Sequence, residues 1–137
     1  MPANFLRIDA RASTGVAALL MLGLVQSAPA VEDADFQFNT TQDLSALCSV
    51  AAGTPEYPIA RQACRAFIEA TLQYHDAVSK PHKLKRLVCY PPNTTIDDGV
   101  TAFNAWAKAR VSDDKSMSEP PVIGLIRAMA AKYPCKG

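Results

Sequence analysis

Four cysteines constrain the fold of this chain more than any other feature of its sequence: Cys48, Cys64, Cys89 and Cys135. An even number of cysteines in a small exported chain is typical of a disulfide framework. Four cysteines allow three different pairings, and the sequence alone does not select one. The sequence therefore predicts a small domain held together by two disulfides.

The first 30 residues have the features of an export leader. Arg7 and Arg11 precede an apolar run over residues 16–25, and the segment ends in Ala-Pro-Ala at Ala30. Signal peptides have this order, with basic residues first, an apolar run next and small residues at the end. The apolar run has about ten residues, whereas about twenty are needed to span a bilayer. We therefore predict a signal peptide over 1–30 that is cleaved after Ala30, which directs the protein to the periplasm.

The net charge of the remaining chain disfavours nucleic acids and anionic membranes as partners. Removal of Arg7, Asp9 and Arg11 leaves twelve basic and twelve acidic residues, so the net charge of residues 31–137 is about zero. A neutral domain has no overall field that attracts nucleic acid or an anionic membrane. No later segment is long and apolar enough to insert in a membrane. We therefore expect neither nucleic-acid binding nor membrane insertion after cleavage.

Apolar residues recur at helical spacing in the first half of this region. The first predicted helix begins at Thr40 or Thr41, whose side chain can cap it, and ends at Gly53. The second begins near residues 56–58 and ends at Pro81. Their predicted inward residues are Leu44, Leu47, Cys48 and Ala51 in the first helix, and Ala60, Ala63, Cys64, Phe67, Thr71, Leu72, His75 and Val78 in the second.

Two more helices are predicted in the second half. The third is capped by Thr94 or Thr95, although Gly99 weakens it by about 1 kcal/mol relative to alanine. The fourth opens at Pro120 and Pro121 and ends at Pro134. Their inward residues are Val100, Phe103, Trp106 or Ala107, Ala109, Val122, Leu125, Ile126, Met129 and Tyr133.

No segment alternates polar and apolar residues with period two, so no sheet is expected. Residues 31–39 are interpreted as an extended lead-in, and residues 111–119 as a polar connection. The fold class predicted is all-α, a single four-helix domain over 31–137, either orthogonal or bundle-like, with two disulfides. Because a short link joins the first two helices, they should lie antiparallel. This arrangement brings Cys48 near Cys64, which leaves Cys89 to pair with Cys135.

The sequence offers no convincing catalytic or metal-binding group. All four cysteines are assigned to disulfides, and no Cys-x-x-Cys pair is present for zinc. His75 and His82 are seven residues apart with a proline between them, so they cannot chelate from one helical face. Asp97-Asp98 fits a helix N-terminus, and Asp113-Asp114 fits a solvated loop. We therefore predict no enzyme activity, no metal and no cofactor.

One basic cluster is a candidate partner-binding site. It consists of Lys80, His82, Lys83, Lys85 and Arg86. Such a cluster on a neutral protein would fit an acidic cleft of a protein partner, and the alternative is an ordinary solvated loop. Tyr90 and Trp106 are residue types enriched in binding hot spots, but a single tryptophan in a small domain more often belongs to the core.

Several landmarks together resemble the Rap and Tai family of periplasmic immunity proteins. The landmarks are Thr41-Gln42-Asp43-Leu44, Leu47-Cys48, Cys64-Arg65-Ala66-Phe67-Ile68, Val88-Cys89-Tyr90-Pro91 and Tyr133-Pro134-Cys135. The resemblance implies an all-helical, disulfide-bonded protein that acts by binding. Proteins of this family protect bacteria against type VI secreted effectors, and they occlude the active-site cleft of a peptidoglycan amidase, often as homodimers. They do no chemistry themselves.

Two other functions are compatible with the residues. The first is a periplasmic acid-stress chaperone that exposes apolar surface at low pH, although two disulfides exceed what that class usually carries. The second is a carrier of a small apolar ligand bound between the helices. Neither alternative has a sequence motif of its own.

Overall fold

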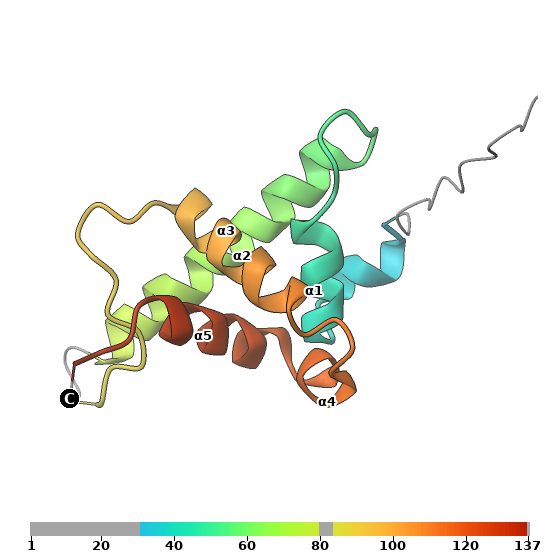
Figure 1. Ribbon diagram of the computed structural model, residues 1–137. Helices are drawn as coiled ribbons and strands as arrows, with labels where there is room; N and C mark the ends of the chain where they lie inside the picture. Colours follow the sequence, from blue (N-terminus) through green and yellow to red (C-terminus); the bar gives the residue numbers. More distant parts are fainter. Residues whose placement is uncertain (1–30, 80–83, 137) are drawn as a thin grey trace, which may run out of the picture.

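The computed structural model describes residues 31–79 and 84–136, and these ranges contain helices and connecting segments but no strand (Figure 1). The helices are η1 (Asp33–Gln37, a 3₁₀-helix), α1 (Thr41–Cys48), α2 (Tyr57–Ser79), α3 (Ile96–Lys108), α4 (Asp114–Ser118) and α5 (Pro121–Lys132). The all-α prediction is confirmed. The predicted leader and its cleavage position lie outside the described residues. Among the helices described, none combines the length and the apolarity needed to cross a bilayer.

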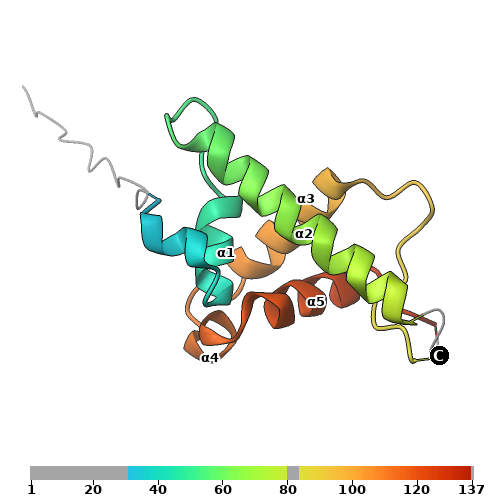
Figure 2. The same cartoon turned by 180° about the vertical axis from the view of Figure 1, so that it is seen from behind.

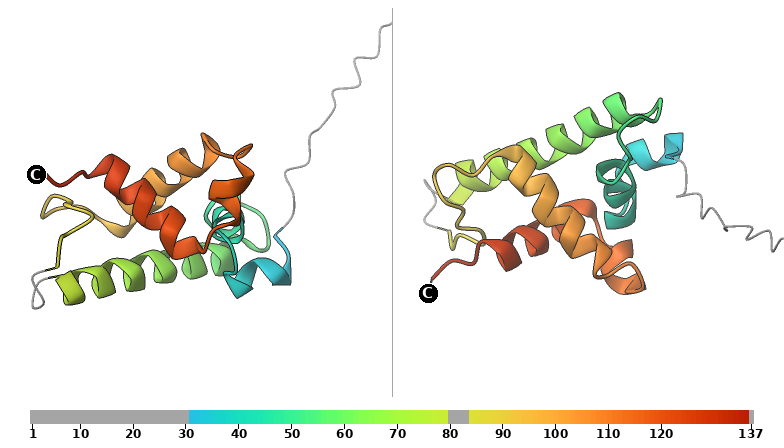
Figure 3. Two further views of the ribbon diagram at one scale, coloured as in Figure 1. Left: turned by 90° about the horizontal axis from the view of Figure 1, so that it is seen from below. Right: turned by 45° about the horizontal axis from the view of Figure 1, so that its top comes forward.

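The long helix α2 lies on one side of the domain, and α3 and α5 lie together on the other (Figures 1 and 2). Figure 3 shows this layering from below, with α2 running beneath the other two helices. α1 contacts α2, α3, α4 and α5, so it closes one end of the domain. At the other end, residues 84–95 loop away from the helices and return to the start of α3 (Figure 3).

Capping residues set the starts of α1 and α3. The Thr40 hydroxyl accepts a hydrogen bond from the Asp43 N–H at 3.2 Å, and the Asp43 carboxylate accepts one from the Thr40 N–H at 2.8 Å. Thr95 and Asp98 form the same reciprocal pair before α3, at 3.1 and 2.8 Å. These capping boxes satisfy amide groups that a helix N-terminus leaves without partners. Both predicted helix starts are confirmed.

The core lies where α1, α2, α3 and α5 meet. Its fully buried large side chains include Leu44, Leu47, Ile68, Val88, Phe103, Leu125 and Met129. Ile68 was not among the predicted inward residues, yet it packs against the glycine of α3. A Cβ at Gly99 would lie 3.1 Å from the Ile68 Cγ2 atom, so the glycine permits a close approach of α2 and α3. The glycine that weakens α3 locally thus improves its packing.

Five local predictions were wrong, and two of them concern the predicted inward residues Ala109 and Val122, which are exposed. Residues 31–39 are not simply extended, because Glu32 and Asp35 form a capping box that supports η1. α1 ends at Cys48 and does not reach Ala51, and the Cys48 carbonyl accepts a hydrogen bond from the Asn104 side chain at 2.8 Å. The polar stretch 111–119 contains α4, which is capped by Asp113 and is anchored by the buried side chain of Met117. Within the described residues, the domain therefore has one 3₁₀-helix and one short α-helix more than predicted.

The disulfides join Cys48 to Cys64 and Cys89 to Cys135, with Cα–Cα distances of 5.1 and 4.9 Å. This is the pairing that we predicted from an antiparallel hairpin of the first two helices. The first disulfide connects the end of α1 to the first half of α2. The second connects the segment after α2 to the segment after α5, where the Cys89 N–H also donates to the Tyr133 carbonyl at 2.9 Å. Each disulfide closes one end of the domain.

Removal of either disulfide should lower the free energy of unfolding, by an amount that depends on the loop it closes. The sequence separations of 16 and 46 residues correspond to about 3 and about 4 kcal/mol in the chain-entropy model. We expect the double variant Cys89→Ala/Cys135→Ala to be the less stable of the two paired variants in urea titrations. Equal stability of the two variants would contradict this order. A variant as stable as the oxidised wild type would contradict the expected loss.

Gly124→Ala should destabilise the protein even though alanine favours helices. A Cβ at Gly124 would overlap the side chain of Thr41, which is fully buried and donates a hydrogen bond to the Glu119 carbonyl at 3.0 Å. Overpacking of this kind costs about 1–3 kcal/mol. Thr41→Ala in the Gly124→Ala background should recover part of that loss, because it vacates the overlapped space. Urea titration of the four proteins of this cycle measures the coupling.

Candidate interaction surface

One exposed face of α2 carries a row of charged and polar side chains, which we call the α2 stripe: Arg61, Arg65, Glu69, Gln73 and Asp76. Spacings of three and four residues place them on the same side of the helix. The stripe borders two surface hollows of about 510 and about 360 Å³. The first hollow is completed by Asp97, and the second by Tyr90 and residues 94–96. The α2 stripe and the segment leading into α3 therefore form one recessed surface.

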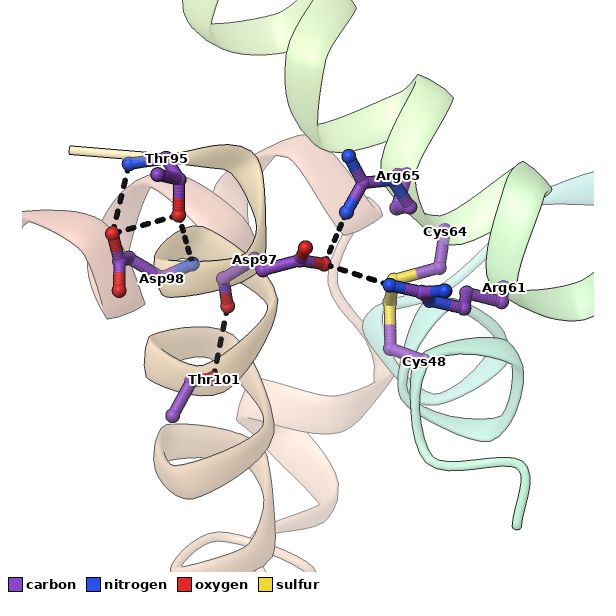
Figure 4. A network of polar contacts seen from close by, with 8 residues as sticks. All are labelled: Cys48, Arg61, Cys64, Arg65, Thr95, Asp97, Asp98 and Thr101. Atoms are coloured by element: carbon purple, nitrogen blue, oxygen red, sulfur yellow. Dashed lines mark hydrogen bonds and ion pairs between the residues drawn. A yellow bond between two sulfur atoms is a disulfide. The ribbon is translucent and has the colours of Figure 1, made fainter. Parts of the chain in front are cut away.

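The basic end of the stripe contains an ion-pair cluster (Figure 4). Arg61 Nη2 lies 3.4 Å from Asp97 Oδ1, and Arg65 Nη1 contacts the same oxygen atom. The hydrogen bond from Arg65 is the largest of the effects that hold the pKa of Asp97 below its usual value. Asp98 is not part of this cluster, because it turns to the opposite side to cap α3 with Thr95 (Figure 4). Two guanidinium groups thus share one carboxylate.

The other end of the stripe is a partly buried polar network around Asp76. Arg86 Nη2 lies 2.9 Å and His75 Nδ1 lies 3.2 Å from Asp76 Oδ1, and the Tyr90 hydroxyl donates to Asp76 Oδ2. Burial alone would raise the pKa of Asp76. The hydrogen bonds from Tyr90 and His75 and the charge of Arg86 outweigh burial, so the pKa of this carboxyl lies below its usual value. Asp76 is therefore a negatively charged carboxylate, and it is the group that the other members of the network contact.

His75 links this network to the segment after α2. Its Nε2 atom accepts a hydrogen bond from the Leu87 N–H at 3.2 Å, so the ring proton lies on Nδ1, facing Asp76. The residue is 7% exposed, in keeping with its predicted inward position in the second helix. The sequence predicted that His75 faces inward, but it did not indicate that the ring holds the backbone of the next segment.

The structure places only part of the predicted basic cluster. Lys80, His82 and Lys83 lie outside the described residues. Lys85 is exposed, whereas Arg86 is half-buried, pairs with Asp76 and lies over the Tyr90 ring at 5.9 Å from its centroid. The Arg86 guanidinium is thus engaged in contacts within the domain. The role of this cluster in partner binding remains a prediction.

The remaining candidates have structural roles. Trp106 is 7% exposed and belongs to the core, with the Arg110 guanidinium 4.5 Å from its ring centroid. Asp113 caps α4 by accepting from the Ser116 N–H at 3.2 Å, so it is not a free loop carboxylate. Within the residues described, His, Cys, Asp and Glu side chains form no group of three or more that could hold a metal ion.

Sequence reasoning did not single out Arg61, Arg65 or the partner role of Asp97. The two arginines are four residues apart in a predicted helix, which places them on one exposed face. That spacing was a usable signal for a basic patch. The participation of Asp97 had no local signal, because the crossing of α2 and α3 brings it there.

The fold and the two disulfides define a small all-helical domain of the disulfide-bonded class. The family model described as Rap1a immunity proteins matches residues 40–135, and the chain belongs to this family. This membership implies an immunity protein that binds a protein effector. The resemblance inferred from the cysteine and proline landmarks is therefore confirmed. Neither a curated protein nor a solved structure gives a significant match to the chain.

Tyr90 should make the stability of the protein fall in strong alkali. Burial, the hydrogen bond to Asp76 and the charge of Asp76 raise the pKa of Tyr90 to about 12, whereas an unfolded tyrosine titrates near 10. The protonated phenol therefore stabilises the fold fully below about pH 10, and this contribution is lost as the pH rises from 10 to 12. In urea titrations, the free energy of unfolding of the wild type should fall by about 1–2 kcal/mol between pH 10 and 12 because of this residue. In Tyr90→Phe, this part of the fall should be absent.

Tyr74→Phe is the matched control for this experiment, because the Tyr74 side chain is 71% exposed. Its pH profile should follow that of the wild type. Ultraviolet titration should also show that the phenol ionising near pH 12 disappears only in Tyr90→Phe. A wild-type profile in Tyr90→Phe would contradict the assignment.

Proposed function

We propose that this protein is a periplasmic immunity protein that neutralises a type VI secreted peptidoglycan amidase by covering its active-site cleft. The observation that carries the proposal is the family match over residues 40–135. Binding to the effector would require no catalytic group on the immunity protein itself. The amidase as target and the occlusion of its cleft follow from the resemblance to the Rap and Tai family.

The two disulfides support the proposed compartment. Disulfides persist in oxidising compartments such as the bacterial periplasm and are rare in the cytosol. A peptidoglycan amidase acts on the cell wall, so an inhibitor in the periplasm meets it where the damage occurs. The predicted signal peptide over 1–30 would deliver the protein there.

We further propose that residues 84–87 form part of the effector contact. Leu84 and Leu87 are 55% and 54% exposed, and the exposed Lys85 lies between them in the sequence. Two anchors hold the backbone here, namely the Arg86–Asp76 ion pair and the hydrogen bond from Leu87 to His75. A preorganised segment with apolar and cationic side chains fits an acidic cleft with apolar walls. This proposal retains the described part of the predicted basic cluster.

A binding assay with a type VI secreted peptidoglycan amidase tests the proposed function. Purified oxidised protein should bind that amidase and stop its cleavage of isolated peptidoglycan, and its expression in the periplasm should protect cells that receive the amidase. Calorimetry measures the affinity, and sedimentation measures whether the immunity protein is a homodimer. Failure to bind or inhibit any such amidase would refute the proposed function.

The variant Leu84→Asp/Leu87→Asp tests the proposed contact. It should weaken amidase binding by at least about tenfold, because each substitution puts an unpaired charge in the interface. Val111→Asp is the control, since Val111 is 73% exposed in the connection between α3 and α4. Equal affinities of the two variants would show that residues 84–87 are not part of the effector contact.

A further inference from the structure

We propose that Arg61 and Arg65 form a docking site for a carboxylate of the effector, and that Asp97 occupies this site in the free protein. On binding, an aspartate or glutamate side chain of the effector replaces Asp97 between the two guanidinium groups. This inference rests on the proposed function, because it names the chemistry through which the effector is recognised.

The charge balance of the cluster supports an acidic partner. Arg61 and Arg65 both contact a single oxygen, Asp97 Oδ1, which leaves most of their N–H donors without a carboxylate. Guanidinium groups bind carboxylates best through two parallel hydrogen bonds. The neighbouring Asp98 adds no second acceptor, because it is committed to Thr95 (Figure 4). The cluster therefore has an excess positive charge and unused donors.

The cluster is also accessible to a partner. The side chains of Arg61, Arg65 and Asp97 are 50%, 32% and 58% exposed, and they line the hollow of about 510 Å³. A third hollow, of about 390 Å³, adjoins it, shares Tyr57 and Arg61 with it, and includes Val100. A segment of the effector can therefore place an acidic side chain on the arginines and an apolar side chain in the adjoining hollow.

The backbone under the cluster is held in place independently of the ion pairs. Cys64, the residue before Arg65, is bound covalently to Cys48, and the disulfide lies beside Arg61 (Figure 4). The close packing of Gly99 on Ile68 holds α3 against α2. Exposed ion pairs contribute little to stability, so the exchange of Asp97 for an external carboxylate leaves the fold intact. Such a preorganised site loses little entropy on binding.

Two variants that break the same internal ion pairs test the proposal, because docking predicts opposite effects. Arg61→Gln/Arg65→Gln should weaken effector binding by about tenfold or more, since it removes the donors. Asp97→Asn should strengthen binding by about threefold, since it removes the internal competitor. Lys108→Gln/Lys115→Gln removes the same charge from exposed positions elsewhere and should bind like the wild type.

A purely structural role of the cluster predicts a different result. Both variants would then lower the thermal midpoint together, and their affinities for the effector would fall together or stay unchanged. Either of those results overturns the docking site. Circular dichroism melting of each variant, run beside the calorimetry, shows that a loss of affinity occurs in folded protein.

A titration with hexaglutamate separates this inference from the proposed function. In low salt the peptide should shift the NMR signals of the Arg61 and Arg65 Nε–H groups, more strongly in Asp97→Asn, whereas hexalysine should not. Absence of these shifts in both the wild type and Asp97→Asn overturns the docking site, even if the amidase binds. Absence of amidase binding in the wild type refutes the proposed function, whatever the peptide does.

Discussion

The covalent closure of both ends of the domain is the constraint on which the other features depend. The Cys48–Cys64 disulfide joins α1 to the first half of α2, and the Cys89–Cys135 disulfide joins the two segments that follow α2 and α5. Between these ties, short helices pack around a small core, in which Phe103 and Leu125 are fully buried. A core of this size leaves a small margin of stability, and the disulfides reduce the entropy of the unfolded chain.

Closure at the ends also explains how a long irregular segment is kept in one place. Residues 84–95 form no helix, yet Val88 is fully buried and Arg86, Leu87 and Tyr90 are bound to His75 or Asp76. Polar groups of α2 therefore substitute for the hydrogen bonds that regular structure would supply. The surface proposed for effector binding is built on this segment and on α2, so its shape is set before any partner arrives.

The candidate site could be predicted only in part, because its members come from separate elements. The basic residues after α2 were recognisable as a cluster, but their pairing was not: Arg86 contributes to an internal network, while Lys85 remains exposed. Asp97 was recognisable as a first-turn carboxylate of a helix. Its contact with Arg61 and Arg65 depends on how α2 crosses α3, and no local pattern encodes that crossing.

The sequence by itself determined the four main helices and the caps of α1 and α3, because helical spacing and capping boxes are local in the chain. It favoured one disulfide pairing through the short link between the first two helices, and the structure has that pairing. It also determined the family, through the landmarks around the cysteines. Only the tertiary structure decided the short helix α4, the tautomer of His75 and the two arginines that share Asp97. These features depend on contacts between residues far apart in the sequence, and such contacts exist only after the helices have packed.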